Sequence, residues 1–370
     1  MHQADMILDF QFGSTGKGLL AGYLAKRGGY DTAVCAFAAN AGHTYIDASR
    51  GLHVMTQQLP TAITSPTVKT ILLGPGSLIC PETLRAEIAK YAAHLAGKQI
   101  LIHPQAAVIL PWHASEEKNT GLLKIGSTGK GVGAAMIERI QRNPNSHNTA
   151  ARVFPVIGLG HLVATTAQYR DALEKAESII IEGAQGFGLS LYHGFYPYTT
   201  SRDVTPWQIA ADCGLPFKWA TYINVCGTLR TYPIRVNNRD GSSGPGHPDQ
   251  KEISWDQIGI SPELTTVTKL PRRLFTFSQM QLLEAFWHCG QYWKTNLFLN
   301  FANYLENSAT IDELIGEIER PREMAWNPPK VTWLGFGADD SEVIAREAWD
   351  KSEAEVAQWG AADSEGGEPV

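Results

Sequence analysis

Residues 6–18 read Met-Ile-Leu-Asp-Phe-Gln-Phe-Gly-Ser-Thr-Gly-Lys-Gly, and this stretch decides the fold. Met6–Phe10 is an apolar run too short for a buried helix, so we expect a buried β-strand. The glycine-rich segment Gln11–Gly18 follows at once, and a helix-like segment over Gly18–Arg27 comes next. This arrangement brings backbone N–H groups, a lysine and a helix N-terminus onto phosphate oxygens. We predict a phosphate site here, although such turns also occur without a ligand and the spacing is not that of a Walker A loop.

Short apolar runs recur along the rest of the chain, most with β-branched residues and with a Gly or Pro nearby. Helix-like segments separate several of them. This alternation predicts an α/β fold with a large, mostly parallel central sheet flanked by helices and ligand loops at the carboxyl ends of strands. The further expected strands are Ala33–Phe37, Thr70–Leu73, Gln99–Ile102, Ser178–Ile181, Thr221–Val225, Leu297–Leu299 and Val331–Leu334, and the further expected helices are Pro81–Leu95, Ala134–Arg142, Leu162–Lys175 and Gln279–His288.

The composition limits the expected size of the core, the kinds of partner and the cellular compartment. The 370 residues are 44% hydrophobic and 18% charged, enough for a substantial core in one large domain or two smaller ones. A net charge of -6 gives no bulk attraction to nucleic acid or to an anionic membrane, and we expect neither as a partner. Five widely spaced cysteines without a CxxC pair indicate buried free thiols in a reducing compartment. With no leader and no membrane-spanning run, we expect a cytoplasmic protein.

A second motif, Asn40-Ala41-Gly42-His43-Thr44, follows the second expected strand. With the glycine-rich segment it resembles the adenylosuccinate synthetase family, whose signatures are a QWGDEGKG loop and an NAGHT segment. Further matches follow in the family's order: Ile125–Gly133, Glu182–Gly186, Tyr196–Ser201 and Thr266–Arg273. They extend from about residue 8 to residue 340. The resemblance implies that family's fold as one catalytic domain over residues 1–360. The acidic, glycine-rich residues 361–370 are expected to be a disordered tail.

The resemblance implies a reaction in two steps. The γ-phosphoryl group of a nucleoside triphosphate moves to the purine 6-oxygen, and the aspartate amine then displaces phosphate. Ser14, Lys17 and His43 occupy catalytic positions, and His43 can donate to a phosphate oxygen. Ser14 and the Gly42 carbonyl are the expected protein ligands of Mg²⁺, which prefers oxygen. The implied triphosphate site comprises Gly13, Ser14, Thr15, Gly16, Lys17, Gly18, Gly42, His43, Thr44, Asn303 and Gly335.

The same resemblance implies sites for the two other substrates. The purine monophosphate would contact Ser14, Asn40, Ser127, Thr128, Arg142, Gln185, Leu189 and Thr200. Aspartate would be bound by Thr266, Val267, Thr268, Arg272 and Arg273, because guanidinium groups suit carboxylates geometrically. In the family the arginine at the position of Arg142 reaches the nucleotide of the neighbouring subunit, which implies a homodimer. The alternative for Arg142 is a solvated charge near a helix end.

Ser14 departs from the family pattern inside the site. The family has an aspartate there, which removes the N1 proton of the purine and binds Mg²⁺. A serine hydroxyl is a poor base and a neutral, weaker metal ligand. A phage branch of the family, the PurZ type, carries serine at this position and takes dGMP in place of IMP. The shorter neutral side chain leaves room beside N1 for the 2-amino group of guanine.

Two further departures concern the sugar and the triphosphate. Leu270 replaces an arginine near the ribose 2′-hydroxyl, which leaves that hydroxyl without a partner and favours deoxyribose, unless Lys269 takes over after a small loop shift. Phe301 and Asn303 replace the lysine and aspartate that read guanine in the triphosphate. Because an amide both donates and accepts, Asn303 can face adenine. We therefore expect ATP or dATP in preference to GTP.

Together these features predict a ligase that joins L-aspartate to C6 of dGMP with ATP or dATP and Mg²⁺. The product would be N6-succino-2-amino-2′-deoxyadenylate, a precursor of 2-aminoadenine in phage DNA, made in the host cytoplasm. Two alternatives remain open. One is an adenylosuccinate synthetase that uses IMP and GTP, against which Ser14, Leu270 and Asn303 argue. The other is a non-catalytic nucleotide-binding regulator, which would have no need of the Arg272–Arg273 pair.

Overall fold

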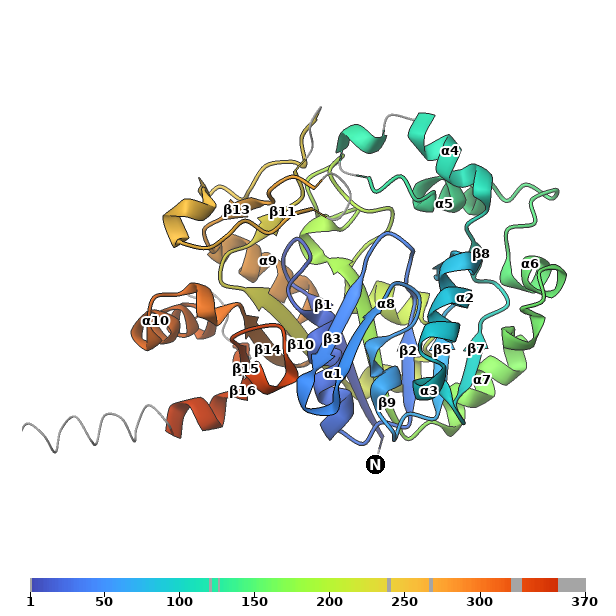
Figure 1. The fold of residues 1–370 in the computed structure, drawn as a ribbon, viewed down its shortest axis with the longest axis horizontal. Coiled ribbons are helices and arrows are strands. Elements are labelled where there is room, and N and C mark those ends of the chain that lie inside the picture. Colours follow the sequence, from blue (N-terminus) through green and yellow to red (C-terminus); the bar gives the residue numbers. More distant parts are fainter. Residues whose placement is uncertain are drawn as a thin grey trace, which may run out of the picture.

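The computed structural model describes residues 2–119, 122–125, 127–237, 241–265, 269–320 and 328–351. Its centre is a nine-stranded sheet in the order β16-β15-β14-β10-β1-β9-β2-β5-β7 (Figure 1). Every neighbouring pair in this sheet is parallel except β15 with β16. The strands are β1 (Gln3–Asp9), β2 (Thr32–Cys35), β5 (Thr70–Leu73), β7 (Gln99–Ile102), β9 (Ser178–Gly186), β10 (Ile223–Arg230), β14 (Lys294–Asn300), β15 (Lys330–Gly335) and β16 (Val343–Ala345). The predicted fold class is confirmed.

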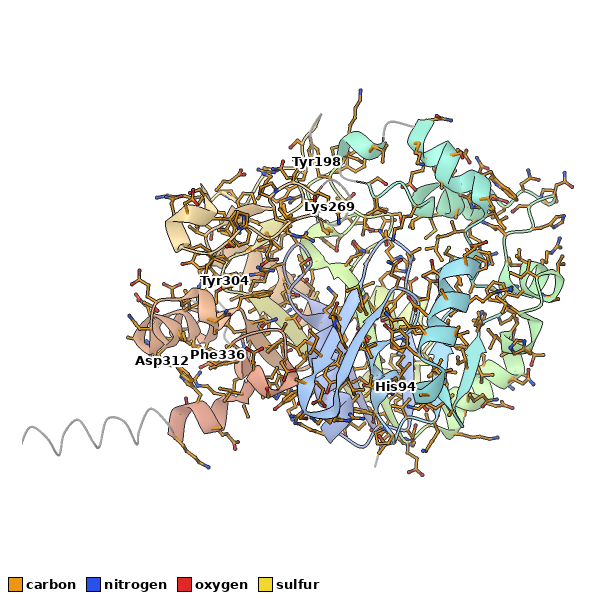
Figure 2. All side chains as sticks on the ribbon, viewed as in Figure 1. His94, Tyr198, Lys269, Tyr304, Asp312 and Phe336 are labelled. Atoms are coloured by element: carbon orange, nitrogen blue, oxygen red, sulfur yellow. The ribbon has the colours of Figure 1, made fainter. Side chains whose placement is uncertain are left out.

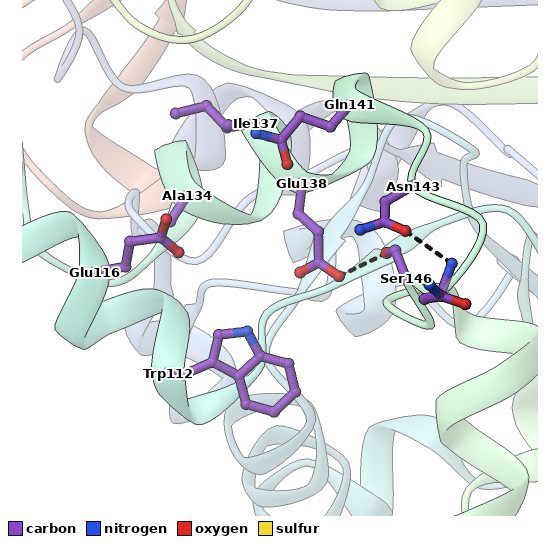
Figure 3. A pocket seen from close by; sticks show the side chains of 9 residues that line it. Trp112, Glu116, Ala134, Ile137, Glu138, Gln141, Asn143 and Ser146 are labelled. Carbon is purple, nitrogen blue, oxygen red and sulfur yellow. Dashed lines mark hydrogen bonds between the residues drawn. The ribbon is translucent and has the colours of Figure 1, made fainter.

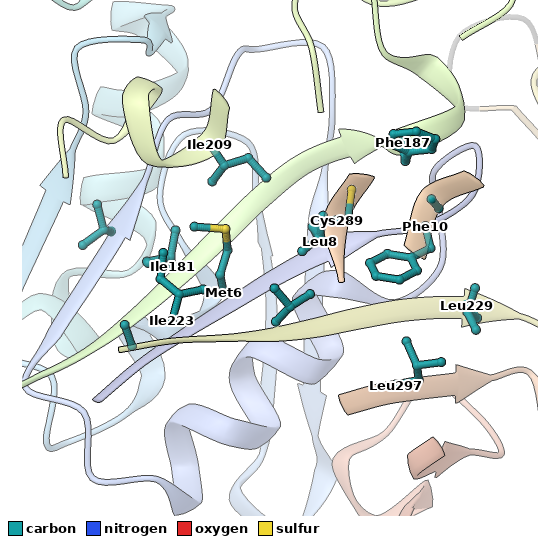
Figure 4. Packing of buried hydrophobic residues seen from close by; sticks show 14 of the residues in the cluster. Met6, Leu8, Phe10, Ile181, Phe187, Ile209, Ile223, Leu229, Cys289 and Leu297 are labelled. Carbon is teal, nitrogen blue, oxygen red and sulfur yellow. The ribbon is translucent and has the colours of Figure 1, made fainter. Parts of the chain in front are cut away.

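Helices cover both faces of this sheet because successive side chains of a strand point to opposite faces. In β1, Met6 and Leu8 belong to one apolar cluster and Ile7 belongs to the other. Figure 4 shows the first cluster, in which Met6 and Leu8 lie with Ile181 of β9. Four helices pack on that face: α7 (Thr166–Lys175), α8 (Pro206–Asp212), α9 (Gln279–Cys289) and α10 (Ser308–Glu319). Four others pack on the opposite face: α1 (Lys17–Arg27), α2 (Pro81–Lys90), α3 (Ala92–Leu95) and α6 (Ala150–Val156).

Smaller elements lie outside the central sheet. A hairpin of β3 (His43–Asp47) and β4 (Leu52–Thr56) packs on α1. Helices α4 (Pro111–Asn119) and α5 (Val132–Gln141) pack on each other. The remaining strands form one three-stranded and one two-stranded sheet: β11 (Ile234–Arg235), β13 (Arg273–Phe275) and β12 (Glu252–Ile253), then β6 (Leu78–Ile79) with β8 (Ala107–Val108).

Several element boundaries differ from the predicted ones. The expected helix over Pro81–Leu95 divides at Tyr91, whose backbone leaves the helical range. The helix expected from Leu162 begins instead at Thr166, because the side chain of Thr165 caps its N-terminus. Arg142 lies just past the end of α5 in the left-handed conformation. These shifts affect helix ends, where local hydrogen bonds decide the boundary.

Other predictions concern the cysteines, membranes and the tail. All five cysteines are free, and four of them are buried while Cys80 is partly exposed. In the part of the chain that the structure describes, no helix combines the length and apolar character needed to cross a membrane. The predicted tail over residues 361–370 lies outside the described residues.

Candidate functional site

The segment after β1 forms a tight loop at the carboxyl end of the strand. Gly13 and Gly16 have φ values of 100° and 94°, and Ser14 has a φ of 57°. Gly16 is the N-cap of α1 and offers no side-chain cap, so the first N–H groups of α1 have no side-chain acceptor there. Since a helix N-terminus with free N–H groups attracts anions, this loop has the geometry of a phosphate site. The Ser14 side chain is exposed beside it.

The buried carboxylate of Asp9 contacts three residues of this loop. Asp9, the last residue of β1, is fully buried and accepts hydrogen bonds from Thr15 Oγ1 at 2.6 Å and from the Gln11 backbone N–H at 2.6 Å. Lys17 Nζ lies 3.3 Å from the same carboxylate and is also buried. The carboxylate therefore holds the side chains of Thr15 and Lys17 in place within the loop. Sequence reasoning missed Asp9, and its signal was a charged residue inside an apolar strand.

His43 begins β3 and lies buried against the aromatic ring of Phe37, with ring centroids 4.0 Å apart. Its Nδ1 lies 2.8 Å from Glu182 Oε1. The other oxygen of Glu182 accepts from Thr61 N–H at 2.8 Å and from Thr61 Oγ1 at 3.0 Å. An ionised carboxylate only accepts, so Nδ1 donates to it and the ring orientation is fixed.

The remaining ring nitrogen, His43 Nε2, is buried and has no hydrogen-bond partner among the described residues. An unpartnered buried polar atom in a folded protein calls for a ligand. The structure thus leaves His43 Nε2 available to a ligand. Glu182, which orients the ring, was quoted from the sequence only as part of a motif and received no role.

The residues expected to hold the purine nucleotide meet beside the loop. Gln185 Nε2 lies 3.4 Å from Asn40 Oδ1, and the Thr200 backbone N–H donates to Leu189 O at 2.7 Å. Leu189 lies against Gly13. The structure therefore brings Asn40, Gln185, Leu189 and Thr200 to the same end of the sheet as the loop.

Left-handed backbone conformations concentrate at the predicted site. Among the described residues, the non-glycine residues with positive φ are Ser14, Arg142, Gln185, Lys269 and Phe301. Such conformations are unfavourable for residues with a side chain and cluster at ligand sites. Three of them were predicted to bind substrate, Lys269 adjoins the predicted Thr268, and Phe301 lies two residues from the predicted Asn303.

The segment around α4 and α5 holds the other nucleotide candidates. The Ser127 hydroxyl donates to Glu117, which also accepts from the Gly131 backbone N–H. Thr128 follows it, and Arg142 is exposed at the end of α5. In the described part of the chain, none of these three candidates forms a hydrogen bond with the phosphate loop. Thr266, Val267 and Thr268 of the aspartate site lie outside the described residues.

The two arginines of the aspartate site differ in their surroundings. Arg273 is already paired, since Nη2 and Nε lie 2.6 Å and 2.8 Å from the Glu252 carboxylate oxygens, and Nη1 donates to Gly244 O. Arg272 is half-buried, and burial is the largest cause that lowers its pKa. Its guanidinium forms no hydrogen bond with the described residues. Arg272 is therefore ready to bind a carboxylate, whereas Arg273 would first have to leave Glu252.

The carboxyl end of β14 contacts the phosphate loop through Asn300. Asn300 Nδ2 donates to Thr15 O at 3.3 Å, and its side chain fills the space beside Gly16 and Gly335. A Cβ at residue 16 would lie 2.3 Å from Asn300 Nδ2, and one at residue 335 would lie 2.2 Å from its Oδ1. Asn303 is exposed in the short helix η8 (Ala302–Tyr304). Figure 2 labels Tyr304, the last residue of η8, and Lys269, which precedes β13 in the chain.

Comparisons with known proteins show the family to which the chain is similar. The adenylosuccinate synthetase family model matches residues 6–155 and 146–299. The N6-succino-2-amino-2′-deoxyadenylate synthase of Salmonella phage PMBT28 is 45% identical over 363 residues, covering 92% of this chain and 97% of the relative. The protein of the same name from Vibrio phage phiVC8 is 44% identical over 351 residues, covering 94% and 99%.

A solved structure is also similar. The succinoaminodeoxyadenylate synthetase (PurZ) of cyanophage S-2L, bound to dGMP and dATP as an energy donor, superposes with a TM-score of 0.85. It is 40% identical, and the match covers 93% of this chain and 95% of the other. On the extent of the family match, the identity to these relatives and the shared fold, this chain belongs to the adenylosuccinate synthetase family.

Proposed function

We propose that this chain joins L-aspartate to C6 of dGMP, with dATP or ATP as the energy donor, and releases N6-succino-2-amino-2′-deoxyadenylate. Two observations carry the proposal: the phosphate loop presents an exposed, neutral hydroxyl at position 14, and the buried His43 has an unpartnered Nε2. The names of the phage relatives and the dGMP and dATP of the cyanophage structure support it. Such a reaction belongs to the host cytoplasm, whose reducing conditions suit the free cysteines.

In the first step the purine 6-oxygen attacks the γ-phosphorus, and the bond to the β-phosphate oxygen breaks. Lys17 and the N–H groups at the start of α1 stabilise the charge on the phosphates. With both ring nitrogens protonated, His43 donates from Nε2 to a phosphate oxygen while its Nδ1 donates to Glu182, which fixes the direction of the ring. In the second step the amine of aspartate attacks C6 and phosphate leaves, while Arg272 binds a carboxylate of the amino acid.

We further propose that Mg²⁺ binds here together with the triphosphate. Among the described residues no group of three or more His, Cys, Asp or Glu could hold a metal, so the protein offers no cage of its own. Mg²⁺ keeps several waters and takes one or two protein oxygens when phosphates supply the rest. The exposed Ser14 hydroxyl and the Gly42 carbonyl fit that need. When bound, the ion would neutralise phosphate charge.

The energy donor follows from the segment after β14. The exposed Asn303 can donate to and accept from adenine, and it carries no carboxylate for the N1–H and 2-amino groups of guanine. Phe301, two residues earlier, stands where the family has a lysine and is likewise uncharged. We therefore propose that dATP or ATP is used in preference to GTP.

The decisive experiment measures phosphate release by the purified protein with aspartate and Mg²⁺. We expect turnover with dGMP and dATP or ATP, and a rate at least about tenfold lower when IMP replaces dGMP, because a missing or added polar group in a fitted site costs that much or more. Turnover with IMP alone would assign the ordinary synthetase reaction. Binding without turnover in any mixture would favour the non-catalytic regulator, and a strong preference for GTP would contradict the role of Asn303.

We also propose a homodimer in which Arg142 serves the neighbouring site. The outer face of α4 and α5 carries Trp112, Ile137 and Ile140, whose exposed fractions are 56%, 47% and 66%. Figure 3 shows Trp112 and Ile137 beside a cavity of about 250 Å³ that also borders Gln141 and Asn143, the neighbours of Arg142. Apolar side chains gathered on one exposed face mark a protein–protein contact.

Mixing two inactive variants tests this arrangement. We expect Arg142→Ala and His43→Ala each to be nearly inactive alone, and an unfolded-and-refolded equal mixture to recover roughly a quarter of the sites, as random pairing in closed twofold dimers requires. In a mixed dimer, one site has both a native His43 and a native Arg142 from the partner. A mixture no more active than its components would place Arg142 in its own subunit's site or outside any site.

A further inference from the structure

Arg230 ends β10 and lies fully buried behind the phosphate loop. Its Nη1 donates to the Ser14 carbonyl at 2.9 Å, and its Nε donates to Tyr232 O at 3.1 Å. Glu263 pairs with the guanidinium through both of its carboxylate oxygens. The guanidinium also lies 3.6 Å from the ring centroid of Phe301. A buried guanidinium needs such partners, and apart from the nearby Tyr232 they come from three different loops, those of Ser14, Glu263 and Phe301.

Two of these partners have unfavourable backbone conformations. Ser14 has a φ of 57° and Phe301 a φ of 61°, both in the left-handed region. A residue with a side chain stays there only where surrounding contacts hold it. Arg230 holds the first through its carbonyl oxygen and the second through the face of its ring. One side chain thus restrains both strained residues.

The third partner extends the connection toward the aspartate site. Glu263 Oε1 accepts from the Tyr304 hydroxyl at 3.0 Å, and the Glu263 backbone carbonyl accepts from the Arg272 N–H at 2.8 Å. Burial, with the neighbouring Glu263, raises the pKa of Tyr304 to about 12, so this hydroxyl keeps its proton and donates. The Arg230–Glu263 pair therefore joins the segment after β14 to the segment that carries Arg272.

We infer that Arg230 is a positioning residue for this reaction. Without touching substrate, it holds Ser14 and Phe301 in the conformations in which the phosphate loop and the base-binding segment receive the triphosphate. The identity of that triphosphate rests on the proposed function, but the positioning role does not. A guanidinium suits the role because it is planar, permanently charged and able to donate in several directions at once while stacking on a ring.

The test compares Arg230→Gln in two backgrounds, the native protein and Ser14→Gly, by calorimetric titration of the full-length chain with dATP and, in parallel, GTP. In the native background we expect the Kd of the bound triphosphate to rise at least about tenfold. Because glycine adopts a positive φ without support, we expect the rise in the Ser14→Gly background to be at least about threefold smaller. An equal or larger rise there would overturn the positioning role.

Arg27→Gln is the matched control. Its guanidinium also pairs with a carboxylate, that of Asp340 at 2.8 Å and 2.9 Å, and also lies 3.6 Å from an aromatic centroid, that of Tyr23, but at the far end of α1. We expect it to lower Tm and leave the Kd unchanged; an equal weakening of binding would show that Arg230 acts only through stability.

If Arg230→Gln does not fold, Arg230→Lys takes its place in the same cycle with the same criterion. If the protein binds GTP and not dATP, the proposed energy donor fails, and the cycle with GTP still decides the role of Arg230.

Discussion

Replacing His43 with alanine is expected to lower kcat by about 10²–10³-fold, the usual loss when one preorganised donor to a developing charge is removed. The Kd for dATP should change by less than about threefold, since the N–H groups at the start of α1 and Lys17 still bind the phosphates. We expect kcat to fall much more than dATP binding because the unpartnered His43 Nε2 would act mainly on the charge that develops during phosphoryl transfer. Rapid-quench measurement of phosphoryl transfer and equilibrium titration of dATP would measure the two quantities separately. Equal losses in turnover and binding would reassign His43 to a structural role.

Glu182→Gln gives a companion measurement. The amide still accepts a hydrogen bond but carries no charge, so it orients the ring while stabilising its charged form less. We expect a smaller loss in kcat than His43→Ala causes. Since Glu182 also receives both hydrogen bonds from Thr61, Tm should be followed in parallel to separate orientation from folding.

Ser14→Asp should weaken the use of dGMP, with kcat/KM falling by about 10²-fold or more, as when a site loses room or a partner for a polar group. The carboxylate would occupy the space that we assign to the guanine 2-amino group. Steady-state kinetics with dGMP and IMP on the same preparation measure the change.

Ser14→Ala is the control for that change, because it removes the hydroxyl and leaves the space open. We expect it to retain more dGMP turnover than Ser14→Asp. If Ser14→Asp used dGMP as well as the native protein does, the steric explanation of substrate choice would be wrong.

Much of the fold could be predicted from the sequence because buried parallel strands are short apolar runs. Thr70–Leu73 and Gln99–Ile102 match β5 and β7 residue for residue. By contrast, β9 and β10 extend beyond their predicted ends to Gly186 and Arg230, where polar residues and glycines interrupt the apolar pattern. The strand pairing continues there because neighbouring strands supply the hydrogen bonds.

Candidate site residues could be named from the sequence where they stand in a motif, and could not be named where tertiary contacts alone bring them to the site. Gly13–Gly18 and His43 stood in recognisable segments. Arg230 and Asn300 did not, because their roles arise from partners more than 200 residues away along the chain. Arg273 shows that a motif alone can mislead. Its motif predicts that it binds the carboxylate of a ligand, but in the fold it pairs with the carboxylate of Glu252.

The position of Asn300 between Gly16 and Gly335 also limits how this protein can change over generations. Any side chain added at either glycine would collide with the amide, and shrinking the amide alone would open a void and release the Thr15 carbonyl. Single replacements at these three positions are therefore expected to be destabilising. A side chain at Gly16 or Gly335 would require at least a compensating change at Asn300.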